Sequence, residues 1–200
     1  MPAVDGIALL KEDHRTVKKL FKDFAATGDR AHATRRKIVD RIITELSIHA
    51  GIEETVLYPR SRAVVKGAEP DVLEALEEHH LVKLTCAELE KMDAKDERFA
   101  AKVQVLTENV KHHIEEEETD LFPRLRKAFS RAELLQMGAD MRAAKLIVPS
   151  RSHPGAPDQP PGNLAAAAVT APVDAAVRTV GAAVRRGRMA VAGAVEGNSR

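Results

Sequence analysis

Aromatic residues are scarce in this chain: they make up 3% of it, and there is no tryptophan. A core must therefore be mostly aliphatic, which favours packed helices, because strands are enriched in aromatic and β-branched residues. The single cysteine, Cys86, excludes an intramolecular disulfide framework and a zinc site made of cysteines alone. The formal net charge of +1 gives no electrostatic argument for a nucleic-acid partner, and we expect none.

Long uncharged apolar runs are also missing. No stretch approaches the roughly 20 apolar residues that a membrane-spanning helix needs. The first residues, MPAVDGIALLKEDH, lack the basic segment and apolar run of a signal peptide. We therefore expect a cytoplasmic protein without stable membrane insertion. The 200 residues, 44% hydrophobic and 30% charged, suit one compact domain with an appendage.

Apolar residues recur at every third or fourth position along most of the chain, a spacing that is typical of amphipathic helices. The breaks between these stripes predict four helices, over residues 5–26, 31–63, 70–92 and 97–127. A capping-box pattern, Ser130 with Glu133, predicts a shorter fifth helix that ends near Ile147. Because short connections join the four helices, we predict an all-α, up-down four-helix bundle over residues 1–148.

The composition changes at Pro149. The remainder of the chain holds six of the ten prolines, six of the eleven glycines and no lysine. Residues 149–163 are predicted to be a disordered linker. Residues 164–200, rich in alanine, valine and arginine, are predicted to be a marginal helix or disordered. A weak valine stripe there leaves open a helix that binds a protein partner.

The sequence repeats itself after 64 or 65 residues. Residues 48–62, IHAGIEETVLYPRSR, align with residues 112–126, HHIEEEETDLFPRLR. The tripeptide that ends in His14 aligns with the one that ends in His79. The two halves are thus two copies of a helical hairpin, which can bury their shared faces against each other.

Each apolar stripe carries a histidine near its middle, and two of these histidines are followed four residues later by a glutamate. Residues at i and i+4 share one helix face, so both side chains can reach one centre. A shared cation would offset the cost of burying imidazoles and carboxylates. Four histidines and two glutamates exceed a tetrahedral zinc site and suit two metal ions, iron or manganese. The predicted ligands are His14, His49, Glu53, His79, His113 and Glu117.

A structural explanation competes with this one. A single core histidine, or a single His-x-x-x-Glu pair, is more often structural than metal-binding. A purely structural helical bundle therefore stays a hypothesis, although two copies of the pattern on predicted buried stripes favour metal.

The histidine doublets require a choice. The repeat selects His79 over His80 and His113 over His112. We interpret His80 as a packed or interface histidine, with a further ligand role as the alternative. Cys86, on the same predicted face as His79, is interpreted as a buried, unreactive thiol.

Tyr58 and Phe122 occupy equivalent positions of the repeat, each followed by a proline. We favour the interpretation that both rings cap the core, and the alternative is that the Tyr58 hydroxyl reaches the site. The prolines, Pro59 and Pro123, are predicted to end or kink their helices.

With these motifs, residues 5–127 resemble a hemerythrin-like domain, also called the HHE cation-binding domain. The resemblance implies a four-helix bundle with an oxo-bridged centre of two non-haem iron ions, manganese being the second choice. It also implies that Glu53 and Glu117 bridge the metal ions and that the four histidines are terminal ligands.

The chain departs from the oxygen-carrying members of that family. Four residues after His79, where they have a second histidine, stands Lys83; five residues after His113, where they have an aspartate, stands Glu118. Fewer protein ligands leave more positions open to small molecules. The resemblance then implies binding or reduction of oxygen, hydrogen peroxide or nitric oxide, with catalase-like activity included. The alternative is a non-catalytic oxygen or iron sensor, or an iron store, that acts through a partner.

Overall fold

The computed structural model describes residues 4–163, 165, 166, 168–170, 172 and 174. Most of the predicted tail, residues 164–200, lies outside this described part. All regular elements of the described residues are helical. None of the described helices combines the length and the apolarity that crossing a membrane requires.

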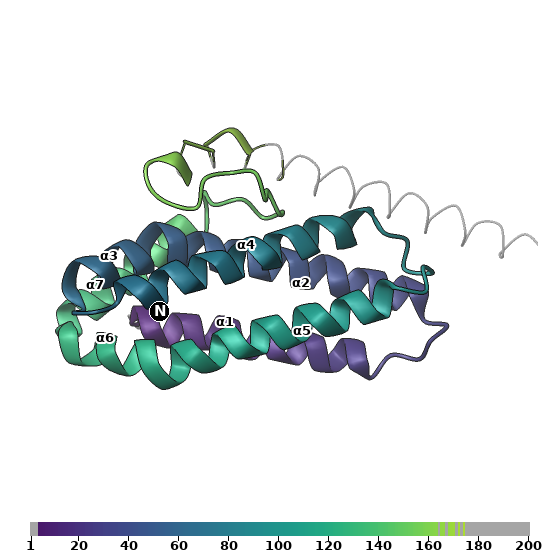
Figure 1. Ribbon diagram of the computed structural model, residues 1–200, viewed down its shortest axis with the longest axis horizontal. Helices are drawn as coiled ribbons and strands as arrows, with labels where there is room; N and C mark the ends of the chain where they lie inside the picture. The colour runs from purple at the N-terminus through teal and green to yellow at the C-terminus, as the bar shows by residue number, and fades with distance from the viewer. Residues whose placement is uncertain (1–3, 164, 167, 171, 173, 175–200) are drawn as a thin grey trace, which may run out of the picture.

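Four long helices form an up-down bundle: α1 (Gly6–Ala25), α2 (His32–Ile52), α4 (Glu69–Lys91) and α5 (Phe99–Glu116) (Figure 1). Two of them continue beyond these bounds. Helix α2 runs on through η1 (Glu53–Leu57) and α3 (Tyr58–Val64), and α5 runs on through η2 (Glu117–Leu121) and α6 (Phe122–Ala128). Helix α7 (Arg131–Ala144) packs against α1 at one end of the bundle. The predicted fold class is therefore confirmed.

Local capping chemistry explains where helices begin. The Asp5 side chain accepts a hydrogen bond from the Ala8 backbone N–H at 2.8 Å, which satisfies an amide that has no partner inside α1. At α7 the predicted capping box is present, because Ser130 and Glu133 each accept the other's backbone N–H.

The two prolines do not end their helices, so that part of the prediction is wrong. Each follows a π-helical turn, in which the backbone N–H of Tyr58 or Phe122 donates to the carbonyl five residues back. The wider turn takes in one extra residue, and Pro59 and Pro123 then stand in the first turn of the next α-helix, where a missing N–H costs little. Both π turns begin at a predicted ligand, Glu53 or Glu117.

The core consists of two apolar clusters. The first, which we call the α7-side cluster, joins residues of α7 such as Met137 to Leu10 and Tyr58. The second, the loop-side cluster, lies toward the α1–α2 and α4–α5 connections and includes Phe24 and Phe99. Both are mostly aliphatic, as the composition predicts.

Residues 149–163, which we call the C-terminal segment, differ from the expected disordered linker. They form turns that lie beside α2 and α4 (Figure 1). Arg151 pairs with Glu90 of α4 at 3.1 Å, and the Asn163 amide donates to the Thr55 hydroxyl at 3.4 Å. Composition alone missed these contacts because each depends on a partner roughly 60 to 110 residues away.

A glycine on α7 allows that helix to approach the N-terminus closely. A Cβ atom on Gly138 would collide with the backbone carbonyl of Val4, and a backbone atom gives way less easily than the end of a flexible side chain. We expect Gly138→Ala to lower the free energy of unfolding by about 1–3 kcal/mol, as overpacking does elsewhere. Gly28→Ala is the control, because nothing lies within 4 Å of its added Cβ. Thermal unfolding of both variants checks this, and equal midpoints would contradict it.

Candidate metal centre

The six predicted ligand residues come together in the middle of the bundle. His14 lies on α1, His79 on α4, and the other four lie on α2–η1 and α5–η2. All six side chains are buried, and that of Glu53 has no exposed surface. The group separates the α7-side cluster from the loop-side cluster, so apolar side chains enclose it from both directions.

The Nε2 atoms of the four histidines point at one another in pairs. Those of His14 and His49 are 3.2 Å apart, and those of His79 and His113 are 3.3 Å apart. One oxygen of Glu53 lies 3.2 Å from His49 Nε2 and the other 3.4 Å from His79 Nε2.

The second glutamate, Glu117, also faces histidines of both pairs. Its Oε2 lies 3.3 Å from His14 Nε2 and 3.8 Å from His113 Nε2. Two overlapping sets of donor atoms result, each compact enough to surround one cation. One set is His14, His49, Glu53 and Glu117, and the other is Glu53, His79 and His113.

A carboxylate faces the outer nitrogen of every one of these histidines. His14 Nδ1 lies 2.9 Å from Glu118. His79 Nδ1 lies 2.9 Å from Glu54 and His113 Nδ1 2.7 Å from Glu78. Because an ionised carboxylate only accepts, these contacts place the proton on Nδ1 and leave Nε2 with a free lone pair. The His49–Asp13 pair is similar but longer, at 3.6 Å.

This arrangement lacks a positive centre. Lone pairs on facing Nε2 atoms repel one another, and both oxygens of Glu53 and one of Glu117 are buried without any hydrogen-bond donor. Buried carboxylate oxygens are normally satisfied, and leaving them unpaired is costly. A shared cation would satisfy all of these atoms at once, so the residues present fit a metal.

Burial is the largest influence on the pKa values of three of the histidines and of Glu53 in this centre. Burial lowers the pKa of His49 to about 4 and also lowers the pKa of His79, which keeps both imidazoles neutral and able to bind metal. Burial, and then the charge of Glu117, raise the pKa of Glu53 well above its ordinary value. For His113, burial lowers the pKa, but the charge of Glu117 and the bond to Glu78 outweigh it, so the net shift is upward.

The chain matches a known family over most of the bundle. The sequence profile of the hemerythrin HHE cation binding domain matches residues 5–125. The chain belongs to this family. An uncharacterized hemerythrin-like protein of Schizosaccharomyces pombe is 32% identical over 164 residues, which cover 82% of this chain and 80% of that protein.

Two further matches have lower sequence identity to this chain. A protein of Nostoc sp. described as a DNA nickase is 27% identical over 143 residues, which are 72% of this chain and 40% of that protein. A crystal structure of a hemerythrin HHE cation binding domain-containing protein from Mycobacterium kansasii aligns with a TM-score of 0.61 and 24% identity. It covers 71% of this chain and 85% of that one, and at this identity it shows the fold alone.

Four carboxylates around this HHE domain's candidate centre were missed by sequence reasoning. Glu118 contacts His14 across the two hairpins, as Glu54 contacts His79. A signal was present, because these two residues are equivalent in the repeat. The same holds for the other two, Asp13 and Glu78, each of which directly precedes a predicted ligand.

The two aromatic residues beside the centre have different roles. Tyr58 is buried in the α7-side cluster, and its hydroxyl donates to Glu117 Oε1 at 3.3 Å and lies 3.3 Å from His79 Nε2. The expectation of core packing alone was therefore incomplete. Phe122, at the equivalent position, stacks on the His14 ring with centroids 5.7 Å apart.

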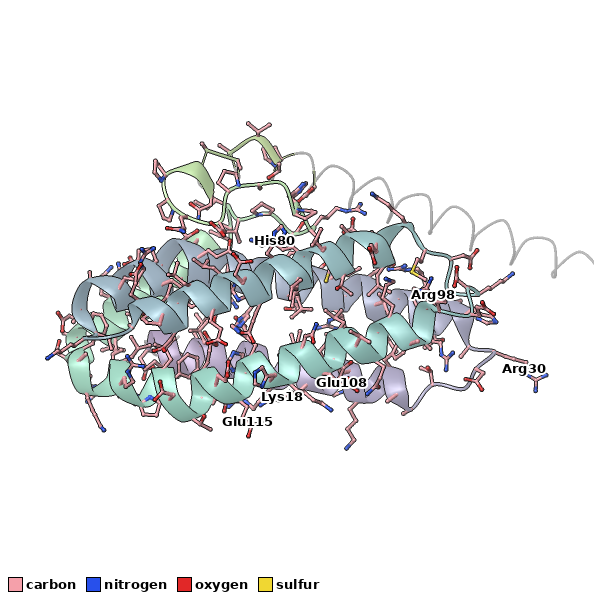
Figure 2. The ribbon with its side chains drawn as sticks, in the orientation of Figure 1. Lys18, Arg30, His80, Arg98, Glu108 and Glu115 are labelled. Carbon is pink, nitrogen blue, oxygen red and sulfur yellow. The ribbon has the colours of Figure 1, made fainter. Side chains whose placement is uncertain are left out.

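The other residues considered from the sequence, His80, His112 and Cys86, differ in their exposure. His80 is exposed (Figure 2), so it is not packed in the core, and the interpretation as an interface histidine stays a prediction. His112 is exposed as well and pairs with Glu116 at 3.3 Å. Cys86 is buried, and burial raises the pKa of its thiol to about 12, which keeps it unreactive.

A small cavity of about 20 Å³ adjoins the centre on the loop-side cluster. All four centre histidines line it, and the rest of its wall is aliphatic. The aliphatic lining residues are Val17, Leu46, Ala50, Val82, Val110 and Ile114. The volume is close to what one water-sized molecule needs, and the four histidines are the polar side chains that line it.

Proposed function

We propose that this protein binds two iron ions at its buried histidine–glutamate cluster and uses them to bind or reduce a small oxidant. Oxygen, hydrogen peroxide and nitric oxide form that ligand class. The observation that carries the proposal is the set of unpartnered Glu53 and Glu117 oxygens among inward-facing Nε2 atoms. The cation binding of the HHE family supports it.

The geometry suggests how the residues would share the two cations. His14 and His49 would bind one, and His79 and His113 the other. Glu53 and Glu117, which face histidines of both pairs, would bind both. Six nitrogen and oxygen donors without a thiolate suit iron, with manganese as the second choice.

Bound iron would supply electrons and open coordination positions for a small oxidant. The protein's own contribution is enclosure and orientation. The two apolar clusters exclude bulk water, and the cavity of about 20 Å³ leaves room for a small molecule only. The Tyr58 hydroxyl donates to Oε1 of Glu117 and so helps to orient that carboxylate, whose Oε2 faces the histidines.

Metal titration and spectroscopy test the proposal. We expect two iron ions per chain in the wild type and fewer than one in the double variant His49→Ala, Glu53→Ala, which removes donors of both sets. The matched control is His112→Ala, Glu116→Ala, which has the same spacing one position earlier on α5 but is exposed. It should bind two.

Consumption of hydrogen peroxide and nitric oxide by the iron-loaded protein then tests the chemistry. We expect turnover that the exposed-pair control keeps and the buried-pair variant loses. Equal rates in wild type and buried-pair variant would refute the oxidant chemistry, and an absence of stoichiometric iron would refute the centre itself.

A further inference from the structure

The two outer carboxylates that cross between the hairpins are equivalent in sequence but differ in their surroundings. Glu54 accepts from His79 and Glu118 from His14, both at 2.9 Å. Glu54 is 4% exposed and Glu118 is 28% exposed. One of the two contacts is thus enclosed by protein, and the other faces solvent.

Lys83 and Lys18, at equivalent positions of the repeat, accompany Glu54 and Glu118, and Lys11 adds a second contact to Glu118 at 3.9 Å. Lys83 lies 2.7 Å and 2.8 Å from the two oxygens of Glu54 and is 16% exposed. Lys18, its counterpart, lies 3.4 Å from one oxygen of Glu118 and is 45% exposed. Lys83 therefore fixes both oxygens of its partner, whereas Lys18 makes one long contact.

The C-terminal segment is the cause of this difference. Together with α2 and α4 it encloses a cavity of about 50 Å³ whose wall includes Glu54 and Lys83. Its own wall residues include Ser152 and Asn163, and the Arg151–Glu90 pair ties it to α4. Asp174 accepts the backbone N–H groups of Ser150 and Arg151, which fixes the turn where the segment begins.

Burial decides how much each lysine matters. An exposed ion pair contributes about 0–1 kcal/mol, because water replaces the missing partner. Removing one partner of a buried pair leaves a carboxylate that water cannot fully solvate. Without Lys83, Glu54 would be drawn toward the cavity for hydration, and His79 would lose the acceptor that orients its ring.

We propose that Lys83 is a positioning residue of the metal centre. It holds the Glu54 carboxylate against His79 beneath the C-terminal segment, and so raises the metal affinity of one of the two positions. The inference rests on the proposed function and adds that the positions, though related by the repeat, are unequal. The lysine that replaces an expected histidine thus acts on the centre through Glu54, without being a ligand.

Cobalt(II) titration of the full-length, metal-free protein tests this without any turnover. Visible bands report each binding step. We expect two cobalt ions in the wild type and a roughly tenfold weaker affinity for one step in Lys83→Met, since partners of ligand histidines typically change metal affinity 10–100-fold. Lys18→Met, the symmetry-matched control, should leave both steps unchanged within about twofold.

Further variants separate positioning from a general loss of folding. Lys83→Arg keeps the cation and should restore the affinity. Glu54→Gln should weaken the same step, and the double variant with Lys83→Met should be no weaker than Glu54→Gln alone, because both act along one path. Additive losses, or equal titrations for Lys83→Met and Lys18→Met, would overturn the role of Lys83. A wild type that binds no cobalt would refute the proposed function, and this inference with it.

Discussion

Excess ferrous iron, added without oxygen to the metal-free protein, should raise the midpoint of thermal unfolding by at least about 8 °C. A ligand at 1,000 times its Kd stabilises the folded state by about 4 kcal/mol per site. For a chain of this size, 1 kcal/mol corresponds to about 2–4 °C, so a single occupied site accounts for about 8–16 °C. The effect should be large because the folded protein already holds unpartnered carboxylate oxygens and facing lone pairs that a bound cation would satisfy together.

Scanning calorimetry with iron and with a chelator measures this shift. The exposed-pair control, His112→Ala with Glu116→Ala, should show the same shift as the wild type, since neither side chain points into the bundle. A purely structural bundle predicts no shift in any of the proteins. An unchanged wild-type midpoint at saturating iron would therefore favour that hypothesis.

The bundle and the six residues that converge in it could be predicted from the sequence, because both follow from the helical periodicity of the apolar residues. Apolar spacing defines a helix face, and a polar residue such as His49 on that face is visible as an exception. The repeat then selected between neighbours, as for His113 over His112. All six side chains are buried in the structure, while their role as metal ligands stays a prediction.

The contacts of the outer carboxylates, the π turns and the place of the C-terminal segment could not be predicted from the sequence, because they depend on how remote segments pack together. Glu118 contacts a histidine 104 residues earlier, and Glu54 contacts one 25 residues later. Neither glutamate lies on an apolar stripe, so the helical spacing gives no indication of these contacts. The π turns follow from how Pro59 and Pro123 are accommodated, which periodicity does not encode. The C-terminal segment has the composition of a linker, and its place beside α4 is set by contacts such as Arg151 with Glu90.

Replacing Glu53 by methionine should have opposite effects on stability and on metal binding. In the metal-free protein, both Glu53 oxygens are buried without a donor. An unsatisfied buried polar group costs about 1–3 kcal/mol, and methionine fills a similar volume without one. We therefore expect Glu53→Met to raise the free energy of unfolding by about that amount, while iron uptake falls below two per chain because Glu53 faces both histidine pairs.

The pH dependence sharpens this prediction. Burial and the charge of Glu117 raise the pKa of Glu53 above the ordinary value of 4.5, so the folded state keeps a proton that the unfolded state releases. The contribution of Glu53 to the stability of the wild type therefore falls as the pH rises above 4.5, and Glu53→Met lacks this contribution. The gap between the two proteins should widen with pH in denaturant titrations of the metal-free forms. A Glu53→Met variant less stable than wild type at pH 7 would mean that the glutamate is part of the metal-free fold, and that the centre is not arranged around a cation.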